Sequence, residues 1–534
     1  MQPSACSSVP HRPHVLTTSF MLVRATFQEP GTAADGPANQ STVTFLAGHS
    51  LLEVAQSKGI PINAPCGGRG SCGKCLVRVL SGNAPATADD KAMLSEGMLR
   101  EGLRLSCQLR PLTPIRVEVQ SRFDLRAAPR VTPLSLGKEL AREVDIAVDL
   151  GSTSVQLSVL DVNTGVVTGE TSVLNRQVRR GHDVMTRLTH ALKGPEARDE
   201  LTQDAIATLK LLLDAARGRL FDKEAHIRHW FVAANTAMTS LLWGADITRL
   251  AEAPYEPPFT EERTESAKHF GLPGETLTTF PLLGSFVGGD TAAAIIATEL
   301  DRPGLARMLI DIGTNTEIVL AHADVLYACS TPAGPAFEGG NISVGMRAEE
   351  GAIIRIEVRE DGSIRSSTIG SVKPKGICGT GLFEALDALV RAGLVARDGT
   401  VKSEDGRISL ARGVDLLQLD IRELQLAKGA LRTATKILCR TAGIEDVDLG
   451  ALLVAGAFGS HLNHEVAVHL KMFPNVDPSL VRAVGNAALE GALRFARDPS
   501  GTRTRLADIQ ARTRHIELAT RDDFQDIFVE SLGF

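Results

Sequence analysis

Apolar and polar residues alternate over several short stretches in the first 120 residues, as they do in half-buried strands. Ser50 can cap a short helix that Gly59 ends. The predicted elements, in order, are strands over residues 21–30 and 41–46, a helix over 51–58, and strands over 76–82 and 115–120. Two strands, a helix and returning strands predict a small α+β domain of β-grasp type.

The hydrophobic pattern changes after residue 143, where longer apolar strands alternate with helical patterns as far as Phe534. Residues 121–142 hold Pro129, Pro133, Gly137 and several charges with weak periodicity, which predicts a linker. Residues 1–20 lack the basic and apolar parts of a secretory signal and predict a disordered tail, so that Met21 could be the true start. The expected division is a tail (1–20), a small domain (21–120), a linker (121–142) and a large α/β domain (143–534) with lobes of about 143–300 and 301–534.

Composition narrows the class of protein without identifying it. The 534 residues are 43% hydrophobic and 22% charged, with a net charge of -6 and only 4% aromatic residues. This balance gives no electrostatic or stacking basis for nucleic-acid binding, and no apolar run is long enough to span a membrane. The absence of a targeting signal predicts a cytoplasmic location.

Four cysteines in the small domain carry the strongest chemical signal in the chain. Cys66, Cys72 and Cys75 have the spacing C-x5-C-x2-C, and Cys107 follows after a longer gap. A [2Fe–2S] cluster needs four thiolates in a related spacing, and the interleaved glycines allow backbone N–H groups to approach the sulfide. Zinc is the alternative, but structural zinc sites usually use two close cysteine pairs. The segment from Cys66 to Cys107 resembles [2Fe–2S] ferredoxins, nearest to the vertebrate-type and bacterial hydroxylase members.

The large domain contains two similar hairpin patterns about 160 residues apart. Residues 145–161 (DIAVDLGSTSVQLSVLD) and 308–321 (MLIDIGTNTEIVLA) each place an Asp-x-Gly turn between two apolar strands, which suggests an internal duplication. Such a turn can cradle a phosphate group, and its aspartate can hold Mg²⁺ through water. A third apolar strand, in residues 452–463 (LLVAGAFGSHLN), ends in glycines that suit a nucleoside lying against the backbone.

These three segments, in this order, resemble the actin/hexokinase/Hsp70 ATPase superfamily, whose fold is two related α/β (ribonuclease H-like) lobes. The resemblance implies binding of ATP with Mg. It assigns the phosphate and adenosine contacts to Asp149, Gly151, Ser152 and Thr153, to Asp311, Gly313, Thr314 and Asn315, and to Gly456 and Gly459.

Several single residues remain open between a chemical and a structural role. Asp290, after paired glycines, suits a nucleotide or Mg²⁺ contact better than a simple turn. Glu317 could position water or Mg²⁺, or could be an exposed strand carboxylate. Asn235 predicts a helix cap. Arg179 and Arg180 could contact phosphate or a partner, or could form a solvated basic turn.

Further stretches of the chain indicate which family of this superfamily it resembles. They are residues 175–188, 233–238, 284–294, 330–346 and 376–382. With an N-terminal [2Fe–2S] domain, they resemble the reductive activators of corrinoid-dependent enzymes. The resemblance implies ATP-dependent return of a Co(II) corrinoid to Co(I) in a corrinoid-binding methyl-transfer protein. It also implies an upstream electron donor, a flavoprotein or a ferredoxin, and a homodimer. Longer members carry a further domain before the ATPase domain, and the gap between Gln120 and Val144 predicts that this chain lacks it.

Two other functions fit the same residues. The first is a small-molecule kinase with an attached ferredoxin, in which Asp290 would face the substrate hydroxyl. The second is a nucleotide-dependent docking module that holds an electron-transfer partner without catalysis.

Overall fold

The computed structural model describes residues 21–28, 40–58, 60, 62–64, 68, 70, 73–94, 96–120, 128–134, 140–459 and 461–534. Cys66 and Cys72, together with the tail expected over residues 1–20, lie outside the described residues. The chain divides into two compact units, with the boundary near residue 123.

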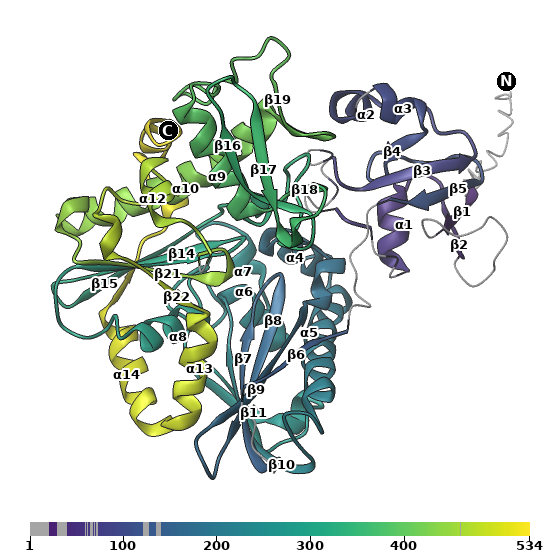
Figure 1. The fold of residues 1–534 in the computed structure, drawn as a ribbon. Helices are drawn as coiled ribbons and strands as arrows, with labels where there is room; N and C mark the ends of the chain where they lie inside the picture. The colour runs from purple at the N-terminus through teal and green to yellow at the C-terminus, as the bar shows by residue number, and fades with distance from the viewer. Residues whose placement is uncertain are drawn as a thin grey trace, which may run out of the picture. The chain divides into compact units, whose positions relative to one another are not determined.

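The first unit is a five-stranded sheet with the strand order β2-β1-β5-β3-β4 (Figure 1). Its strands are β1 (Leu22–Gln28), β2 (Gln40–Leu46), β3 (Leu76–Ser81), β4 (Leu103–Leu105) and β5 (Ile115–Val119). All five expected elements are present, and the helix α1 (Leu51–Ser57) begins at Ser50 with a capping box to Glu53. The β-grasp prediction is confirmed. The short helices α2 (Ala88–Met93) and α3 (Glu96–Arg100), and strand β4, were not predicted.

The second unit contains two large sheets that repeat one topology. The first sheet has the order β11-β12-β10-β7-β8-β9-β6 and the second β22-β21-β13-β14-β15-β23. The antiparallel strands β7 (Ala141–Leu150), β8 (Ser154–Asp161) and β9 (Val167–Leu174) of the first sheet correspond to β13 (Arg307–Ile312), β14 (Thr316–His322) and β15 (Val325–Thr331) of the second. The matching parallel strands are β10 (Phe221–Ala233) and β12 (Thr276–Thr279), against β21 (Ala451–Ala455) and β22 (Val481–Gly485). The duplication predicted from the two hairpins is therefore present in the strand order.

Helices cover each sheet and fill the space between the two sheets. Helices α4 (Val184–Ala191), α5 (Pro195–Ala216) and α6 (Thr236–Leu242) pack on one face of the first sheet. Helices α9 (Gly379–Arg391) and α10 (Gln418–Ala442) pack on one face of the second sheet. The facing surfaces of both sheets share a third apolar core, here called the inner layer, with helices α8 (Gly289–Thr298) and α13 (Ala487–Arg497).

Helices α8 and α13 pack closely because a glycine lies at their contact. A Cβ atom on Gly491 would lie 2.0 Å from the carbonyl oxygen of Ala293, which no side chain could tolerate. These two helices follow the equivalent strands β12 and β22 of the two lobes. Their contact brings their N-terminal residues to the junction between the lobes.

Part of the expected linker belongs to the second unit. Residues Arg130–Pro133 form strand β6, which pairs antiparallel with β9 at the edge of the first sheet. The linker prediction over 121–142 is therefore wrong for these residues. They were missed because four residues at a sheet edge, one of them proline, give little periodic signal.

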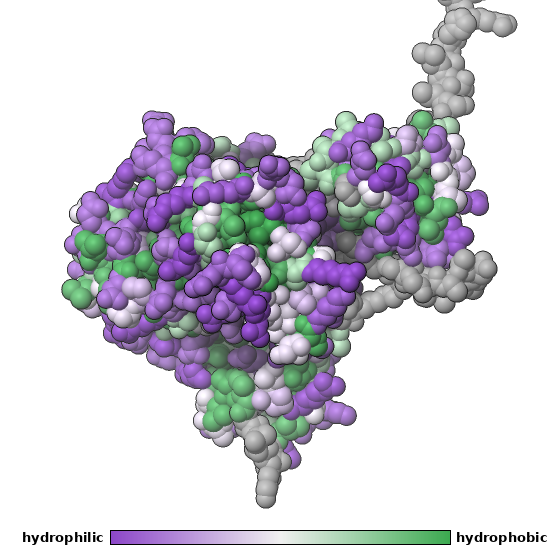
Figure 2. Space-filling view, turned by 45° about the horizontal axis from the view of Figure 1, so that its top comes forward, coloured by the Kyte–Doolittle hydropathy of each residue, from purple (hydrophilic) through white to green (hydrophobic). Residues whose placement is uncertain are grey.

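The edge strands of the two large sheets include β11 (Arg263–Ser266) and β23 (Thr513–His515). The remaining elements of the second unit include helix α14 (Pro499–Arg512) and two small sheets, one of β16 (Ala352–Val358), β17 (Ile364–Thr368) and β18 (Gly376–Ile377) and one of β19 (Arg407–Ala411) and β20 (Val414–Leu417). Among the helices within the described ranges, none is both long and apolar enough to cross a membrane. The visible face in Figure 2 is mostly hydrophilic, with apolar residues in scattered patches.

Candidate functional site

The two loop aspartates point to the same place because of strand periodicity. Ala147 of β7 and Leu309 of β13 lie in the inner layer. Alternate residues of a strand share a face, so Asp149 and Asp311, each two residues further on, also point towards the inner layer. Each aspartate lies at the carboxyl end of its strand, next to the turn of its hairpin.

Two further carboxylates approach the same region. Glu317 of β14 is paired with Asp311 across the hairpin and is only 8% exposed, so the alternative of an exposed strand carboxylate is wrong. Its Oε1 accepts a hydrogen bond of 3.1 Å from Ser330 Oγ. Asp290 lies in the first turn of α8, whose start is tied to the end of β10 by a 3.1 Å hydrogen bond from the Asp290 N–H to the Ala234 carbonyl.

The charges of these four residues act on one another. Burial and the neighbouring Asp311 raise the pKa of Asp290 to about 7. Burial and Asp149 raise the pKa of Asp311 to about 7. Burial raises the pKa of Asp149 to about 6, although a hydrogen bond from Asn486 opposes the shift. Burial, Asp290 and Asp311 raise the pKa of Glu317 well above its ordinary value. Asp149, Asp290, Asp311 and Glu317, here called the carboxylate cluster, therefore form one electrostatic unit.

A cluster of this kind suits a cation held through water. Hard divalent cations prefer carboxylate oxygens, and Mg²⁺ usually keeps several of its own waters. Across the described residues, no group of three His, Cys, Asp or Glu side chains is placed to hold a metal ion directly. The donor set fits water-mediated binding better than a cage made entirely of protein ligands.

The raised pKa values predict how stability depends on pH. Because the pKa of Asp290 is raised in the folded state, its ionisation costs stability between pH 4 and pH 7, and the full cost is present above pH 7. Asp290→Asn cannot ionise. In the absence of metal and nucleotide, we expect the melting temperature of this variant to be close to that of the wild type at pH 4.5 and clearly higher at pH 8. The difference at pH 8 should correspond to more than about 1 kcal/mol in the free energy of unfolding. A difference that stays constant between the two pH values would contradict the electrostatic account of the cluster.

The two phosphate loops meet each other at the junction between the lobes. Thr153 Oγ1 and Thr314 Oγ1 are 3.2 Å apart and share a hydrogen bond. Each glycine is required by its turn, because a Cβ on Gly151 or Gly313 would lie 2.5 or 2.9 Å from a backbone carbonyl of the same turn. The carbonyl of Asn315 is the group that crowds Gly313. The structure therefore brings together the two segments that the sequence indicated as phosphate loops.

The first loop is held in place by side chains that the sequence analysis did not single out. Asn175 donates from Nδ2 to the Gly151 carbonyl at 2.8 Å, and its N–H donates to the Thr153 carbonyl at 2.9 Å. The guanidinium of Arg187, from α4, is fully buried and donates to the Ser152 carbonyl. Both residues lie in the stretch 175–188 that resembled the corrinoid activators, where sequence alone gave them no role.

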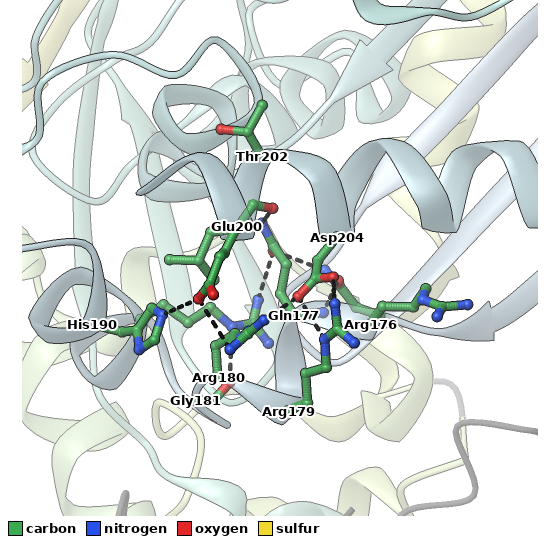
Figure 3. Close-up of polar contacts among 12 residues, drawn as sticks. Arg176, Gln177, Arg179, Arg180, Gly181, His190, Glu200, Thr202 and Asp204 are labelled. Carbon is green, nitrogen blue, oxygen red and sulfur yellow. Dashed lines mark hydrogen bonds and ion pairs between the residues drawn. The ribbon is translucent and has the colours of Figure 1, made fainter. Parts of the chain in front are cut away.

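Arg179 and Arg180 each pair with a carboxylate of the first lobe (Figure 3). Arg179 Nε donates to Asp204 Oδ2 at 2.8 Å, and a second, shorter contact joins the same two side chains. Arg180 forms a 3.0 Å ion pair with Glu200, which also accepts a 3.0 Å hydrogen bond from His190. Both arginines are thus bound to carboxylates of α5, and the alternative of a solvated basic turn is wrong.

The other lobe contributes a contact that the sequence analysis missed. Asn486 is the N-cap of α13, where its Oδ1 accepts from the Leu489 N–H at 2.9 Å. Its Nδ2 donates to Asp149 Oδ2 at 2.7 Å, across the junction between the lobes. Asp290 stands at the start of the equivalent helix, α8. The signal was available as Gly485-Asn486 before an amphipathic helix, but it indicated only a cap.

The predicted adenosine segment follows strand β21 and begins the one-turn helix α11 (Gly456–Gly459). Gly456 has φ of 88°, and a Cβ there would lie 2.4 Å from the Ile312 carbonyl and 3.1 Å from Asp311 Oδ1. Gly459 packs against Val454. Gly456 therefore adjoins the carboxylate cluster. Asn235 caps α6 by accepting from the Met238 N–H, as predicted.

The two described cysteines of the predicted cluster set lie together in the first unit. Cys75 Sγ and Cys107 Sγ are 3.3 Å apart, and the residues are 1% and 3% exposed. Strand pairing explains the approach, since Leu76 of β3 pairs with Leu105 of β4 and the Ser106 N–H donates to the Cys75 carbonyl at 2.8 Å. Two thiols at this separation can bind one iron atom.

The described glycines near these cysteines have positive φ angles. Gly68, Gly70 and Gly73 have φ of 90°, 79° and 66°, a region that other residues rarely adopt. Asp90 of α2 is fully buried and accepts a 2.7 Å hydrogen bond from the Leu105 N–H. This bond fixes the end of β4 immediately before Cys107.

Comparison with known protein families assigns three consecutive regions. Residues 37–112 match the 2Fe-2S iron-sulfur cluster binding domain, residues 144–303 match the RACo middle region, and residues 306–534 match the C-terminal domain of RACo, the ASKHA domain. The chain therefore contains the middle region of this family, and this region lies after the gap between Gln120 and Val144 and not within it. The segment expected to be the first ATPase lobe is the segment that matches this middle region.

Individual relatives agree with these regions. The chain is 27% identical to the corrinoid activation enzyme RamQ of Eubacterium limosum, over 91% of this chain and 96% of the relative. It is 25% identical to a [Co(II) methylated amine-specific corrinoid protein] reductase of Methanosarcina barkeri, over 73% and 76%. A solved structure described as a reductive activator for corrinoid, iron-sulfur protein shares the fold, with a TM-score of 0.66, 24% identity and coverage of 96% of this chain and 98% of that chain.

Proposed function

Because this chain belongs to the family of reductive activators of corrinoid proteins, with its 2Fe–2S, middle and ASKHA regions in order, we propose that it reactivates an oxidised corrinoid protein. The proposed reaction is ATP-dependent one-electron reduction of Co(II) to Co(I), with the electron delivered from the [2Fe–2S] cluster. The observation that carries the proposal is the carboxylate cluster beside two joined phosphate loops, in a chain that also pairs Cys75 with Cys107.

The nucleotide is proposed to bind at the junction between the lobes. Gly151, Ser152 and Thr153 would contact its phosphates from one hairpin, and Gly313, Thr314 and Asn315 from the other. Asp149 and Asp311 would hold Mg²⁺ through water, and Asp290 and Glu317 would orient that shell or an attacking water. Gly456 and Gly459, in the segment that follows β21, are the proposed contacts of the adenosine.

Closing the junction around ATP would change the arrangement of the lobes. The hydrogen bond between Thr153 and Thr314, and the one from Asn486 to Asp149, both cross this junction. Phosphate oxygens inserted between the loops would compete for these groups, so nucleotide binding would move the lobes against each other. Such a movement is proposed to perturb the cobalt coordination of the bound corrinoid protein.

The need for ATP follows from the energetics of the electron. When bound, a cluster of the plant type supplies one electron at about −400 mV. A Co(II) corrinoid in its resting coordination is harder to reduce than that. Each 100 mV by which its reduction potential lies below that of the cluster costs about 2.3 kcal/mol, which ATP binding and hydrolysis can offset. Covalent linkage of the two units keeps the cysteine-bearing unit at a high effective concentration near the partner. A flavoprotein or ferredoxin is the proposed upstream donor.

The proposal predicts that the partner stimulates nucleotide turnover. We expect ATP hydrolysis by the full chain to rise severalfold when a Co(II) corrinoid protein is added, and to be unaffected by the same protein held in the methylated Co(III) state. Phosphate release measured under anaerobic conditions tests this. Phosphoryl transfer to a small-molecule acceptor without any corrinoid protein would support the kinase alternative, and nucleotide-dependent partner binding without hydrolysis would support the docking alternative.

A further inference from the structure

A basic pocket lies in the second lobe, on the far side of its sheet from the carboxylate cluster. It is a cavity of about 430 Å³ between α10, the segment that follows α12 (His464–His469), and the residues around the end of α15 (Phe524–Glu530). Helix α10 packs on the face of the second sheet that is opposite to the inner layer. The polar residues that line the basic pocket are Lys428, Arg432, Lys436, Lys471, Asn475, Glu530 and Ser531.

The positive charge of the pocket is only partly neutralised. Lys428, Arg432 and Lys436 lie at intervals of four residues on one side of α10. Arg432 is paired with Asp446, and Lys436 Nζ lies 3.8 Å from Glu530 Oε2.

Neither of the other two lysines forms an ion pair with an Asp or Glu side chain within the described parts of the chain. Lys428 donates to the Gly533 carbonyl, and Lys471 donates at 3.2 Å to a main-chain oxygen of Phe534, the last residue of this chain, where that oxygen is part of a carboxylate. Burial, followed by the charges of Lys471 and two further cations, lowers the pKa of Lys428 to about 7. Lys428 is thus a buried amine among cations, with no carboxylate partner within the described parts of the chain, and an anion beside it would favour its charged form.

A second observation is independent of these charges. Ser531 is 3% exposed, and its hydroxyl oxygen has no hydrogen-bond partner among the residues that the structure describes. A buried hydroxyl without a partner costs about 1–3 kcal/mol, so such groups usually meet a ligand or water. Ser531 is one of the residues that line the same cavity as Lys428 and Lys471.

We propose that the basic pocket binds the phosphate group of a small phosphorylated molecule, with Lys428, Lys471 and the Ser531 hydroxyl as donors. An ammonium group has three donors, and each of these two lysines uses one for a main-chain oxygen, so donors remain for phosphate oxygens. The cavity is larger than a phosphate ion, and Val468 and Phe473 give it an apolar wall. A site for an organic phosphate fits this shape, and it goes beyond the nucleotide site proposed above.

The test uses two variants and one matched control in the full-length chain. Ser531→Ala removes only the hydroxyl. Lys471→Asn removes one cation at a residue with φ of 54°, where asparagine is well tolerated. The exposed Lys402, in the same lobe, provides the control Lys402→Asn.

Isothermal titration calorimetry with inorganic phosphate and with phenyl phosphate measures binding. We expect the wild type and Lys402→Asn to bind alike, and Ser531→Ala and Lys471→Asn to bind at least about tenfold more weakly. Tighter binding of phenyl phosphate than of phosphate identifies an organic phosphate as the ligand class, whereas equal binding identifies the free ion. No binding to the wild type, or unchanged binding to both pocket variants with native circular dichroism, would overturn the proposal. Binding of these ligands at the phosphate loops would be the same in both pocket variants and in the wild type, so only the loss in Ser531→Ala and Lys471→Asn reports on the basic pocket, and it does not depend on corrinoid reduction.

Discussion

Replacing Asp311 with asparagine is expected to lower ATP hydrolysis and ATP-dependent corrinoid reduction at least about a hundredfold. Asp311 lies between the second phosphate loop and the adenosine segment, opposite Glu317 in the hairpin and next to Gly456. The substitution keeps the shape of the side chain but removes the charge that a Mg²⁺-bound nucleotide would need.

A structural defect would give a different result from a functional one. Burial and Asp149 raise the pKa of Asp311 to about 7, so the ionised carboxylate is unfavourable in the folded protein without ligand. Asp311→Asn should therefore be at least as stable as the wild type at pH 8, and its iron–sulfur absorbance should be unchanged. Asp324→Asn, on the exposed turn between β14 and β15, is the matched control and should behave as the wild type. If Asp311→Asn keeps more than half of the wild-type rate, the nucleotide site has been misplaced.

Replacing Cys75 with serine should abolish corrinoid reduction and leave basal ATP hydrolysis in place. Cys75 Sγ lies 3.3 Å from Cys107 Sγ and is shielded from solvent, so loss of this thiolate should prevent assembly of the cluster. We expect corrinoid reduction to fall to background, while basal ATP hydrolysis stays within about twofold of the wild type. The two activities are placed in different units of the chain, and the two variants separate them.

The control for this variant is another buried cysteine. Burial raises the pKa of the Cys439 thiol to about 12, so it is not a thiolate at neutral pH, and it lies in the second unit. Cys439→Ala should keep the full iron content and the full rate of reduction. Anaerobic iron and sulfide analysis with visible absorbance measures the outcome. A Cys75→Ser protein that still reduces the corrinoid at the wild-type rate would exclude the cluster as the electron donor.

Much of the site could be predicted from sequence because it lies on strands. A period of two places Asp149 and Asp311 on the inward face of their strands, and the internal repeat indicates that the two hairpins are equivalent. The same parity would have indicated a buried Glu317, since Val319 of the same strand lies in the inner layer. The burial of Glu317 was left open because a single carboxylate on an apolar strand can also lie at an exposed edge.

The contacts that sequence could not supply join distant segments. Asn486 reaches Asp149 across 337 positions in the chain, and Arg187 supports Ser152 from a different helix. From the sequence alone, neither residue was given a role. Their roles depend on how α13 and α4 pack, which no local pattern specifies.

Formation of Co(I) is the measurement that tests the central claim most directly. A purified Co(II) corrinoid protein is mixed anaerobically with the full chain, an upstream reductant and ATP, and the Co(I) absorbance is followed over time. The account predicts Co(I) with ATP, and none with a non-hydrolysable analogue, without nucleotide, or with Asp311→Asn or Cys75→Ser. Equal formation of Co(I) with and without ATP would contradict it.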